Sequence, residues 1–277
     1  MNGTRFDPLQ PVKHLLLLAF VFLIFFPPYI LFLNAFKGKV EFSQSSVFDF
    51  PRSFFNFENF ADVIERGHLD WAFMNTFAII GMSLLGNVIL GTMVAYVLGR
   101  FDFRMKKAVL GAYILASLIP VVTTQVATFT IIKSLGLYNT VFAPTLLYLG
   151  ADVLQIFIYL QFIKNIPYEL DESAMLEGAS LFRIYRSIIF PLLTPATATL
   201  VILKTINIYN DMYIPYLYMP SQRLVVVSTT LMKFFGEHTT EWQSISAAIL
   251  LIMLPMVAIY LVFQKFIFAG IISGAVK

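Results

Sequence analysis

Six long apolar stretches constrain the fold of this chain more than any other feature of its sequence. A helix needs about 20 mainly apolar residues to cross a hydrocarbon layer of about 30 Å. The stretches that meet this requirement are roughly residues 15–36, 71–98, 108–132, 141–163, 194–217 and 245–268. We therefore predict an all-α, polytopic membrane protein with six transmembrane helices.

The composition leads to the same class. Of the 277 residues, 58% are hydrophobic and only 13% are charged, which is too little charge to cover the surface of a soluble domain. The chain has no cysteine, so disulfides and cysteine-ligated metals are excluded, and its three histidines lie too far apart in the sequence to resemble a metal site. No low-complexity tract or convincing internal repeat divides residues 1–277, so we expect a single transmembrane domain.

Prolines should bend two of the spans. Pro27 and Pro28 should kink the first span. Pro120 should break the third, where the residues beyond it could line a cavity. Alternatively, neighbouring side chains could satisfy the carbonyl groups that the break frees.

The orientation follows from the basic residues, which resist translocation when they lie near helix ends. The tightest basic cluster, Arg100 to Lys107, lies between the second and third expected spans. Placing this cluster in the cytoplasm puts residues 1–14, residues 164–193 and both termini there as well. Residues 37–70 and 219–243 then lie outside.

The connection between the fourth and fifth expected spans is too long for a simple loop. Glu169, Asp171 and Glu172 crowd the first turn of a short helix, where carboxylates complement the helix dipole. Gly178 should break or bend that helix, and a second amphipathic helix should follow until Pro191 ends it. Two short helices at an angle would form a knob that projects into the cytoplasm. Alternatively, the pair could lie on the lipid headgroups.

This connection carries a pattern with fixed spacing. Its members are Glu172, Ser173, Ala174, Gly178, Ile188 and Pro191. The pattern resembles the cytoplasmic signature of binding-protein-dependent ABC permeases, which reads E-A-A, three residues, G, nine residues, I, one residue, L-P. Ser173 replaces the middle alanine and Phe190 replaces the leucine. In that family the loop forms a coupling helix that docks in a cleft of the ATPase subunit, so the resemblance implies the same role for residues 164–193. Ala174 and Gly178 lie four residues apart, and on one helix they would share a small-residue face that permits close approach.

Shorter matches along most of the chain resemble the carbohydrate branch of that family, and in particular the second, shorter permease of maltose-type systems. They comprise residues 56–60, 75–76, 100–104, 135–140, 209–211 and 269–277. Tyr209 stands where the branch has tryptophan before Asn-Asp. In that branch, the tail of one permease reaches the ATPase dimer, which implies an ATPase contact for Gly274 and Ala275.

The resemblance implies a transport subunit and not an enzyme. It implies a second homologous permease, two ATPase subunits or domains that bind ATP and Mg, an extracytoplasmic binding protein and a carbohydrate substrate. It also implies the plasma (inner) membrane of a bacterium or archaeon, with membrane lipid but no nucleic acid as a partner. The sequence has no Gly-rich loop that ends in Gly-Lys-Ser or Gly-Lys-Thr, so we expect no cofactor in this chain.

Several polar residues fall within or near expected spans, where an ionisable group exposed to lipid costs several kcal/mol. Lys204, Asn207 and Asp211 follow helical spacing and should share a face. Together with Asn210 they could form a polar wall of the translocation path that binds sugar hydroxyls. They could instead join helices through hydrogen bonds. Asp152 is expected to be structural.

An ion-coupled secondary transporter is the alternative function. Asp152, Lys204 or Asp211 would then relay a proton or a sodium ion. Such a protein would work without an ATPase and would fail when the ion gradient collapses. A membrane enzyme finds no support, because the sequence has no paired carboxylates, histidine cluster or nucleophile constellation.

Overall fold

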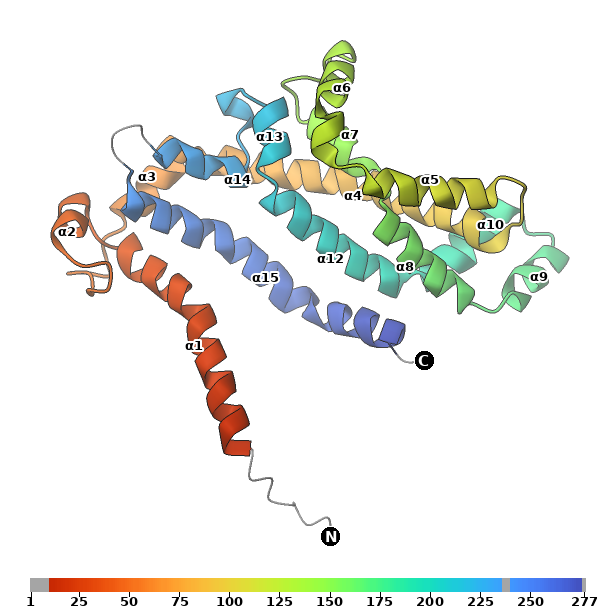
Figure 1. Ribbon diagram of the computed structural model, residues 1–277, viewed down its shortest axis with the longest axis horizontal. Helices are drawn as coiled ribbons and strands as arrows, with labels where there is room; N and C mark the ends of the chain where they lie inside the picture. The colour runs from red at the N-terminus through yellow and green to blue at the C-terminus, as the bar shows by residue number, and fades with distance from the viewer. Residues whose placement is uncertain (1–9, 236–239, 276–277) are drawn as a thin grey trace, which may run out of the picture. The chain divides into compact units, whose positions relative to one another are not determined.

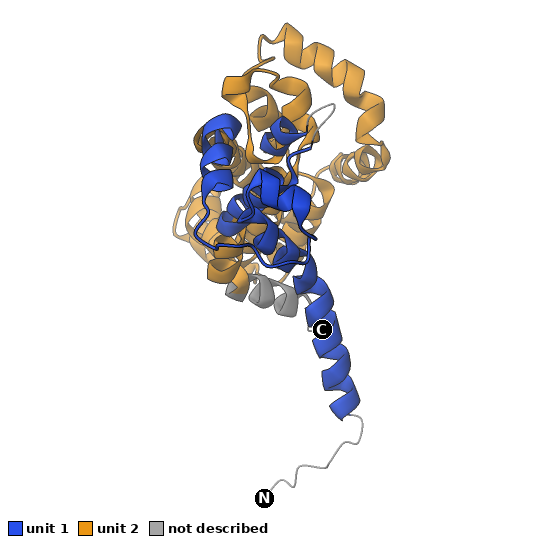
Figure 2. Ribbon diagram, turned by 90° about the vertical axis from the view of Figure 1, so that its left-hand side faces the viewer, with its two compact units in different colours: residues 1–69, 230–255 blue, residues 70–229, 256–277 orange. Residues whose placement is uncertain are grey.

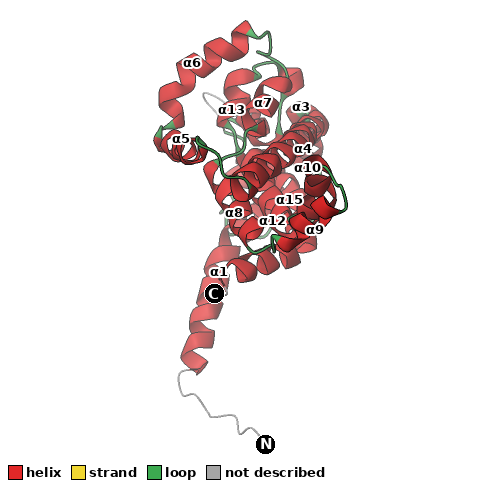
Figure 3. Cartoon of the chain, turned by 90° about the vertical axis from the view of Figure 1, so that its right-hand side faces the viewer, coloured by secondary structure: helices red, strands yellow, loops and turns green. Residues whose placement is uncertain are grey.

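The computed structural model describes residues 10–235 and 240–275, with side-chain environments described as far as Gln264. Throughout these ranges the regular elements are helices, which Figure 1 labels where there is room and Figure 3 colours red. The predicted all-α fold class is confirmed.

Three single helices in the described ranges are long and apolar enough to cross a membrane. They are α1 (Gln10–Ala35), α4 (Leu69–Arg100) and α15 (Trp242–Ala275). They correspond to the first, second and sixth expected spans and extend beyond the expected bounds at most ends. Pro27 and Pro28 lie inside α1.

Three pairs of helices reach the same length and composition only when they are taken together. These pairs are α5 (Lys106–Leu118) with α6 (Val121–Ser134), α7 (Phe142–Leu149) with α8 (Val153–Lys164), and the helical run Leu181–Leu192 with α12 (Thr194–Asn210). Their axes bend by 102°, 45° and 71°, respectively. If each bent pair counts as one span, the described chain has six.

The bends mark where the sequence-based bounds differ from the structure. The expected third span is not continuous: Ile119 is extended before Pro120, as the steric restriction on a residue preceding proline requires. The expected fifth span ends at Asn210 instead of residue 217, because Asp211 is also extended and a separate helix, α13 (Tyr213–Tyr218), follows it.

The remaining elements are short. They are α2 (Lys39–Gln44), α3 (Glu58–Gly67), α9 (Glu169–Leu176), α10 (Leu181–Ile184), the π-helix η1 (Tyr185–Ile189), α11 (Phe190–Leu192), the 3-10 helix η2 (Gln222–Leu224), α14 (Val227–Thr230) and the 3-10 helix η3 (Leu231–Phe234).

The chain forms two compact units, which Figure 2 colours separately. Unit 1 contains residues 1–69 and 230–255, and unit 2 contains residues 70–229 and 256–277. The three divisions fall at the start of α4, inside α14 (Val227–Thr230) and inside α15.

Unit 1 is held by aromatic packing and by polar contacts. Phe36, at the end of α1, packs against Phe32, Phe54, Phe57 and Phe60.

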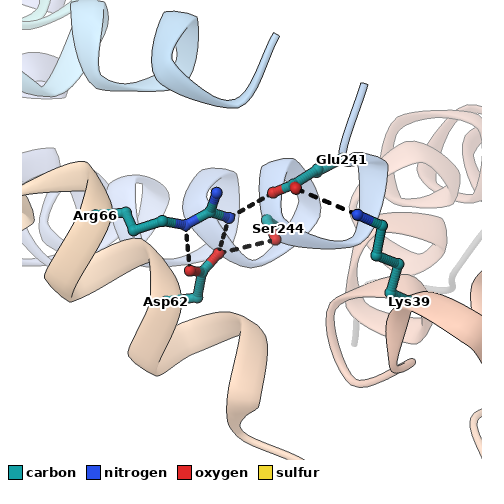
Figure 4. A network of polar contacts seen from close by, with 5 residues as sticks. All are labelled: Lys39, Asp62, Arg66, Glu241 and Ser244. Atoms are coloured by element: carbon teal, nitrogen blue, oxygen red, sulfur yellow. Dashed lines mark hydrogen bonds and ion pairs between the residues drawn. The ribbon is translucent and has the colours of Figure 1, made fainter. Parts of the chain in front are cut away.

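A charged cluster in the same unit joins α3 to the start of α15 (Figure 4). Arg66 pairs with Asp62 and Glu241, Lys39 Nζ lies 3.6 Å from Glu241, and Ser244 donates to Asp62.

Unit 2 has a buried core where α4, α8, the Leu181–Leu192 run and α12 meet. Its buried members are Ala95, Tyr96, Tyr159, Ile163, Ile184, Tyr185, Ile189, Leu193, Ala196 and Leu200. Glycine is required at Gly99, because a Cβ atom there would lie only 2.7 Å from Ile163 Cγ2. The backbone of α4 therefore approaches α8 closely beside this core.

Candidate functional site

Helix α9 presents most of its surface to solvent. Glu172 and Ser173 are exposed, and the side chain of Leu176, in the last turn, is 90% exposed. Of the eight residues of α9, only Asp171 is buried. A projecting helix with exposed apolar and acidic side chains is a surface suited to docking a partner.

Gly178 ends α9 as the sequence predicts. The Ala179 N–H donates to the Ala174 carbonyl at 2.9 Å and the Gly178 N–H donates to the Met175 carbonyl at 3.0 Å. These two bonds form a Schellman motif, which requires a left-handed residue, and Gly178 has φ +80°. The expectation that Ala174 and Gly178 share a helical face is wrong, because Gly178 lies beyond the end of the helix.

The second half of the segment is anchored in unit 2. Ser180 Oγ accepts the Arg183 N–H and caps α10, while Ile184 and Ile189 point into the core. The Tyr185 hydroxyl lies 2.8 Å from Thr92 Oγ1 on α4.

Pro191 does not end the second helix, which continues to Leu192. In a regular α-helix, proline clashes with the carbonyl group four residues earlier. The π-turn of η1 comes just before it, where the Phe190 N–H donates to the Tyr185 carbonyl five residues back. This change in hydrogen-bond register precedes the proline, and the 71° bend follows at Leu193.

A buried ion pair joins α9 to the end of α4. Arg100 Nη2 lies 2.9 Å from Asp171 Oδ2, and the two side chains are only 8% and 5% exposed. The same guanidinium donates to the carbonyl groups of Ile166 and Pro167 and lies over the Tyr168 ring. Burial raises the pKa of the Asp171 carboxyl, and the positive charge of Arg100 opposes that rise.

The proposed substrate-path residues lie on α12 or at its end, and they have different partners. Lys204 lies on α12 and its Nζ is 3.5 Å from Asp152 Oδ2. Asp211 lies beyond the end of α12, where Tyr148 donates a hydrogen bond to it. Asp211 caps the end of α12 with a helical φ of −72°, and the chain leaves the helical path only after it.

Asn207 and Asn210 are exposed on α12. The Asn210 side chain donates to the carbonyl of Ile206 in its own helix. Asp152 Oδ1 accepts the Gln155 N–H and caps α8, which agrees with its expected structural role. No group of three or more His, Asp or Glu side chains in the described ranges could hold a metal ion.

Gly274 and Ala275 belong to the last turns of α15. The surroundings of their side chains lie outside the described part of the structure, so their implied ATPase contact stays a prediction.

Sequence reasoning assigned no structural partner to Arg100, Thr92 or Tyr148. Arg100 entered as a marker of orientation and as part of the family match at residues 100–104, although a basic residue at the end of a span also suggests a partner in the acidic first turn of α9. No local pattern identifies Thr92 or Tyr148, because their partners lie 93 and 63 residues away.

The sequence and the fold of this chain are similar to those of known transport proteins. A sequence profile described as "binding-protein-dependent transport system inner membrane component" matches residues 87–273. The chain is 36% identical over 258 residues to the melibiose/raffinose/stachyose import permease protein MelC of Bacillus subtilis, with 91% of each chain covered. It is 34% identical over 255 residues to the probable starch degradation products transport system permease protein AmyC of Thermoanaerobacterium thermosulfurigenes, again with 91% of each covered.

The fold is also similar to a solved structure. A chain of a bacterial ABC transporter involved in the import of the acidic polysaccharide alginate superposes with a TM-score of 0.82. That comparison covers 96% of this chain and 99% of the other at 18% sequence identity.

Proposed function

Because this chain belongs to the binding-protein-dependent transport system inner membrane components, we propose that it is one permease subunit of an ATP-driven sugar importer. It forms half of the translocation path, and residues 164–193 transmit the motion of an ATPase to the spans. The observation that carries this proposal is the exposed helix α9, which contains the Glu172–Ser173–Ala174 pattern and lies within the matched range 87–273.

The arrangement of this segment supports a coupling role. One part, α9, is exposed, and the second part is anchored in the core of unit 2 by the buried side chains of Ile184, Tyr185 and Ile189. A partner that binds the exposed part can therefore act on α4, α8 and α12 through the anchored part. A helix pair that only lies on lipid headgroups does not need side chains buried in the core of unit 2.

The proposed partners follow from this role. A second homologous permease completes the path, two ATPase subunits or domains bind ATP and Mg, and an extracytoplasmic binding protein delivers the substrate. The permease itself catalyses no reaction and holds no cofactor. Residues 164–193 and both termini lie in the cytoplasm.

The substrate class comes from the relatives. MelC is named as a melibiose/raffinose/stachyose permease and AmyC as a permease for starch degradation products, so a di- or oligosaccharide is proposed here. Asn207 and Asn210 offer exposed amide groups on α12 that suit hydrogen bonding to sugar hydroxyls.

The test is uptake by the complete complex in vesicles. The permease pair, the ATPase and the binding protein are reconstituted, and uptake of labelled melibiose, raffinose or a malto-oligosaccharide is measured with and without ATP. We expect uptake that requires ATP and binding protein and that survives an ionophore. Uptake without ATP that collapses with the ionophore would instead establish the ion-coupled alternative.

A further inference from the structure

We propose that Arg100 and Asp171 form the positioning pair that connects α9 to span α4, so that a displacement of α9 moves α4 with it. This inference rests on the proposed coupling role of residues 164–193. It concerns a contact that the sequence pattern of that segment does not include.

The Arg100–Asp171 ion pair lies between the end of α4 and the start of α9. Arg100 is the last residue of α4, a helix of 32 residues, and Asp171 lies in the first turn of α9. Asp171 is the buried residue of an otherwise accessible helix, and Ala174, one turn later, is the half-buried residue that packs against the core of unit 2. The contact of α9 with the rest of unit 2 is therefore concentrated on one face, with the ion pair at its start.

Arg100 also holds the chain that leads into α9. Its guanidinium donates to the carbonyl groups of Ile166 at 3.0 Å and Pro167 at 3.4 Å, and it lies 5.5 Å from the centre of the Tyr168 ring. A planar cation with several donors can hold these groups together, which a lysine ammonium cannot do in the same geometry. Rotation of α9 about this connection would break several contacts at once.

The surroundings keep bulk water away from the pair. A cavity of about 30 Å³ adjoins it, lined by side chains that include Tyr96, Met175, Leu181 and Ile184. It is large enough for an ordered water molecule, and both carboxylate oxygens of Asp171 and the Nε of Arg100 are buried atoms without a hydrogen-bond partner in the protein. In such a site the attraction between the charges is screened much less than at the surface.

An exposed ion pair just after α4, between α4 and α5, provides the control. Lys106 Nζ lies 2.9 Å from Asp102 Oδ1, but the Asp102 side chain is 98% exposed. The substitution Asp102→Asn makes the same chemical change as Asp171→Asn, and solvent replaces the lost interaction.

The experiment uses the complete complex in vesicles with saturating binding protein. Three variants are compared with Asp102→Asn: Arg100→Gln, Asp171→Asn, and the double variant, which removes both charges and leaves no unpaired buried charge. The measurements are the amount of co-purified ATPase, ATP hydrolysis with and without binding protein, and the sugar transported per ATP hydrolysed.

We expect Arg100→Gln and Asp171→Asn to retain the ATPase and its unstimulated hydrolysis. Stimulation by binding protein should fall about tenfold, within the range for residues that carry coupling between sites. The double variant should lose no more than either single variant, since both remove one connection. Asp102→Asn should behave as wild type.

Wild-type stimulation and wild-type sugar per ATP in the assembled double variant would overturn the proposal. Loss of assembly in all three variants would also overturn it, because the pair would then be structural only. Gly178→Leu in the same assay separates the two claims. If it too remains fully coupled, the proposed function of the segment fails, whereas coupling retained only in the Arg100 and Asp171 variants refutes the positioning pair alone.

Discussion

The hydroxyl of Tyr148 donates a hydrogen bond of 2.9 Å to Asp211 Oδ2, which ties α7 to the residue that ends α12. Asp211 also accepts the Ile214 N–H at 3.1 Å through Oδ1, and its carbonyl accepts the Ser228 hydroxyl at 2.7 Å. Three interactions therefore converge on Asp211. This geometry favours a structural role for Asp211 over direct contact with substrate.

We predict that Asp211→Ala destabilises the subunit by about 1–3 kcal/mol, the usual loss when a hydrogen-bonded charged group is removed. Thermal unfolding of the purified complex measures the effect. Asn210→Ala is the matched control, because Asn210 is exposed and its side chain bonds to its own helix. Equal unfolding temperatures for the two variants would return Asp211 to the set of path candidates.

Asn207 gives the clearest test of the substrate path. It is exposed on α12, so its removal should leave assembly and thermal stability unchanged. If its amide binds a sugar hydroxyl in the path, Asn207→Ala should reduce the maximal rate of uptake or raise the apparent KM about two- to tenfold, the equivalent of one neutral hydrogen bond. Uptake kinetics identical to wild type would exclude Asn207 from the path.

Gly178 can be tested with two substitutions of similar size. Leucine is strongly disfavoured at φ +80°, whereas asparagine adopts left-handed conformations at lower cost. No atom outside the neighbouring residues lies within 4 Å of a Cβ atom built at Gly178, so bulk alone causes no clash inside this chain. We predict that Gly178→Leu leaves the permease in the membrane but abolishes substrate-stimulated ATP hydrolysis, and that Gly178→Asn retains most of it.

Comparing Gly178→Leu with Gly178→Asn distinguishes backbone strain from steric obstruction by the side chain. Loss of stimulation in both variants would show that any side chain obstructs the docked ATPase. Wild-type turnover by Gly178→Leu would refute the coupling role of the segment.

The proposed orientation can be checked by labelling, since the chain has no native cysteine. Ser43 follows α1 and Arg104 follows α4, and both are exposed. A cysteine at Ser43 should react with a membrane-impermeant thiol reagent added outside, and a cysteine at Arg104 only after the membrane is opened. The reverse pattern would invert the topology and remove residues 164–193 from the cytoplasm.

The sequence by itself determined the features that depend on composition and on local backbone chemistry. Apolar stretches of spanning length predicted the helices, because apolar side chains must be removed from water wherever they lie in the fold. Pro120 predicted the break in the third span and Gly178 the end of α9, since each acts through its own backbone.

Only the tertiary structure decided which distant residues meet. Helical spacing suggested a shared face for Lys204 and Asp211, but it could not show that α12 ends at Asn210 or that Tyr148 and Ser228 bind Asp211 there. Arg100 and Asp171 could not be paired from the sequence, because burial and proximity arise only when α4 and the segment after α8 pack together. Local sequence patterns predict which secondary structure each segment can form. The contacts between segments depend on how all the helices pack together, which no local pattern contains.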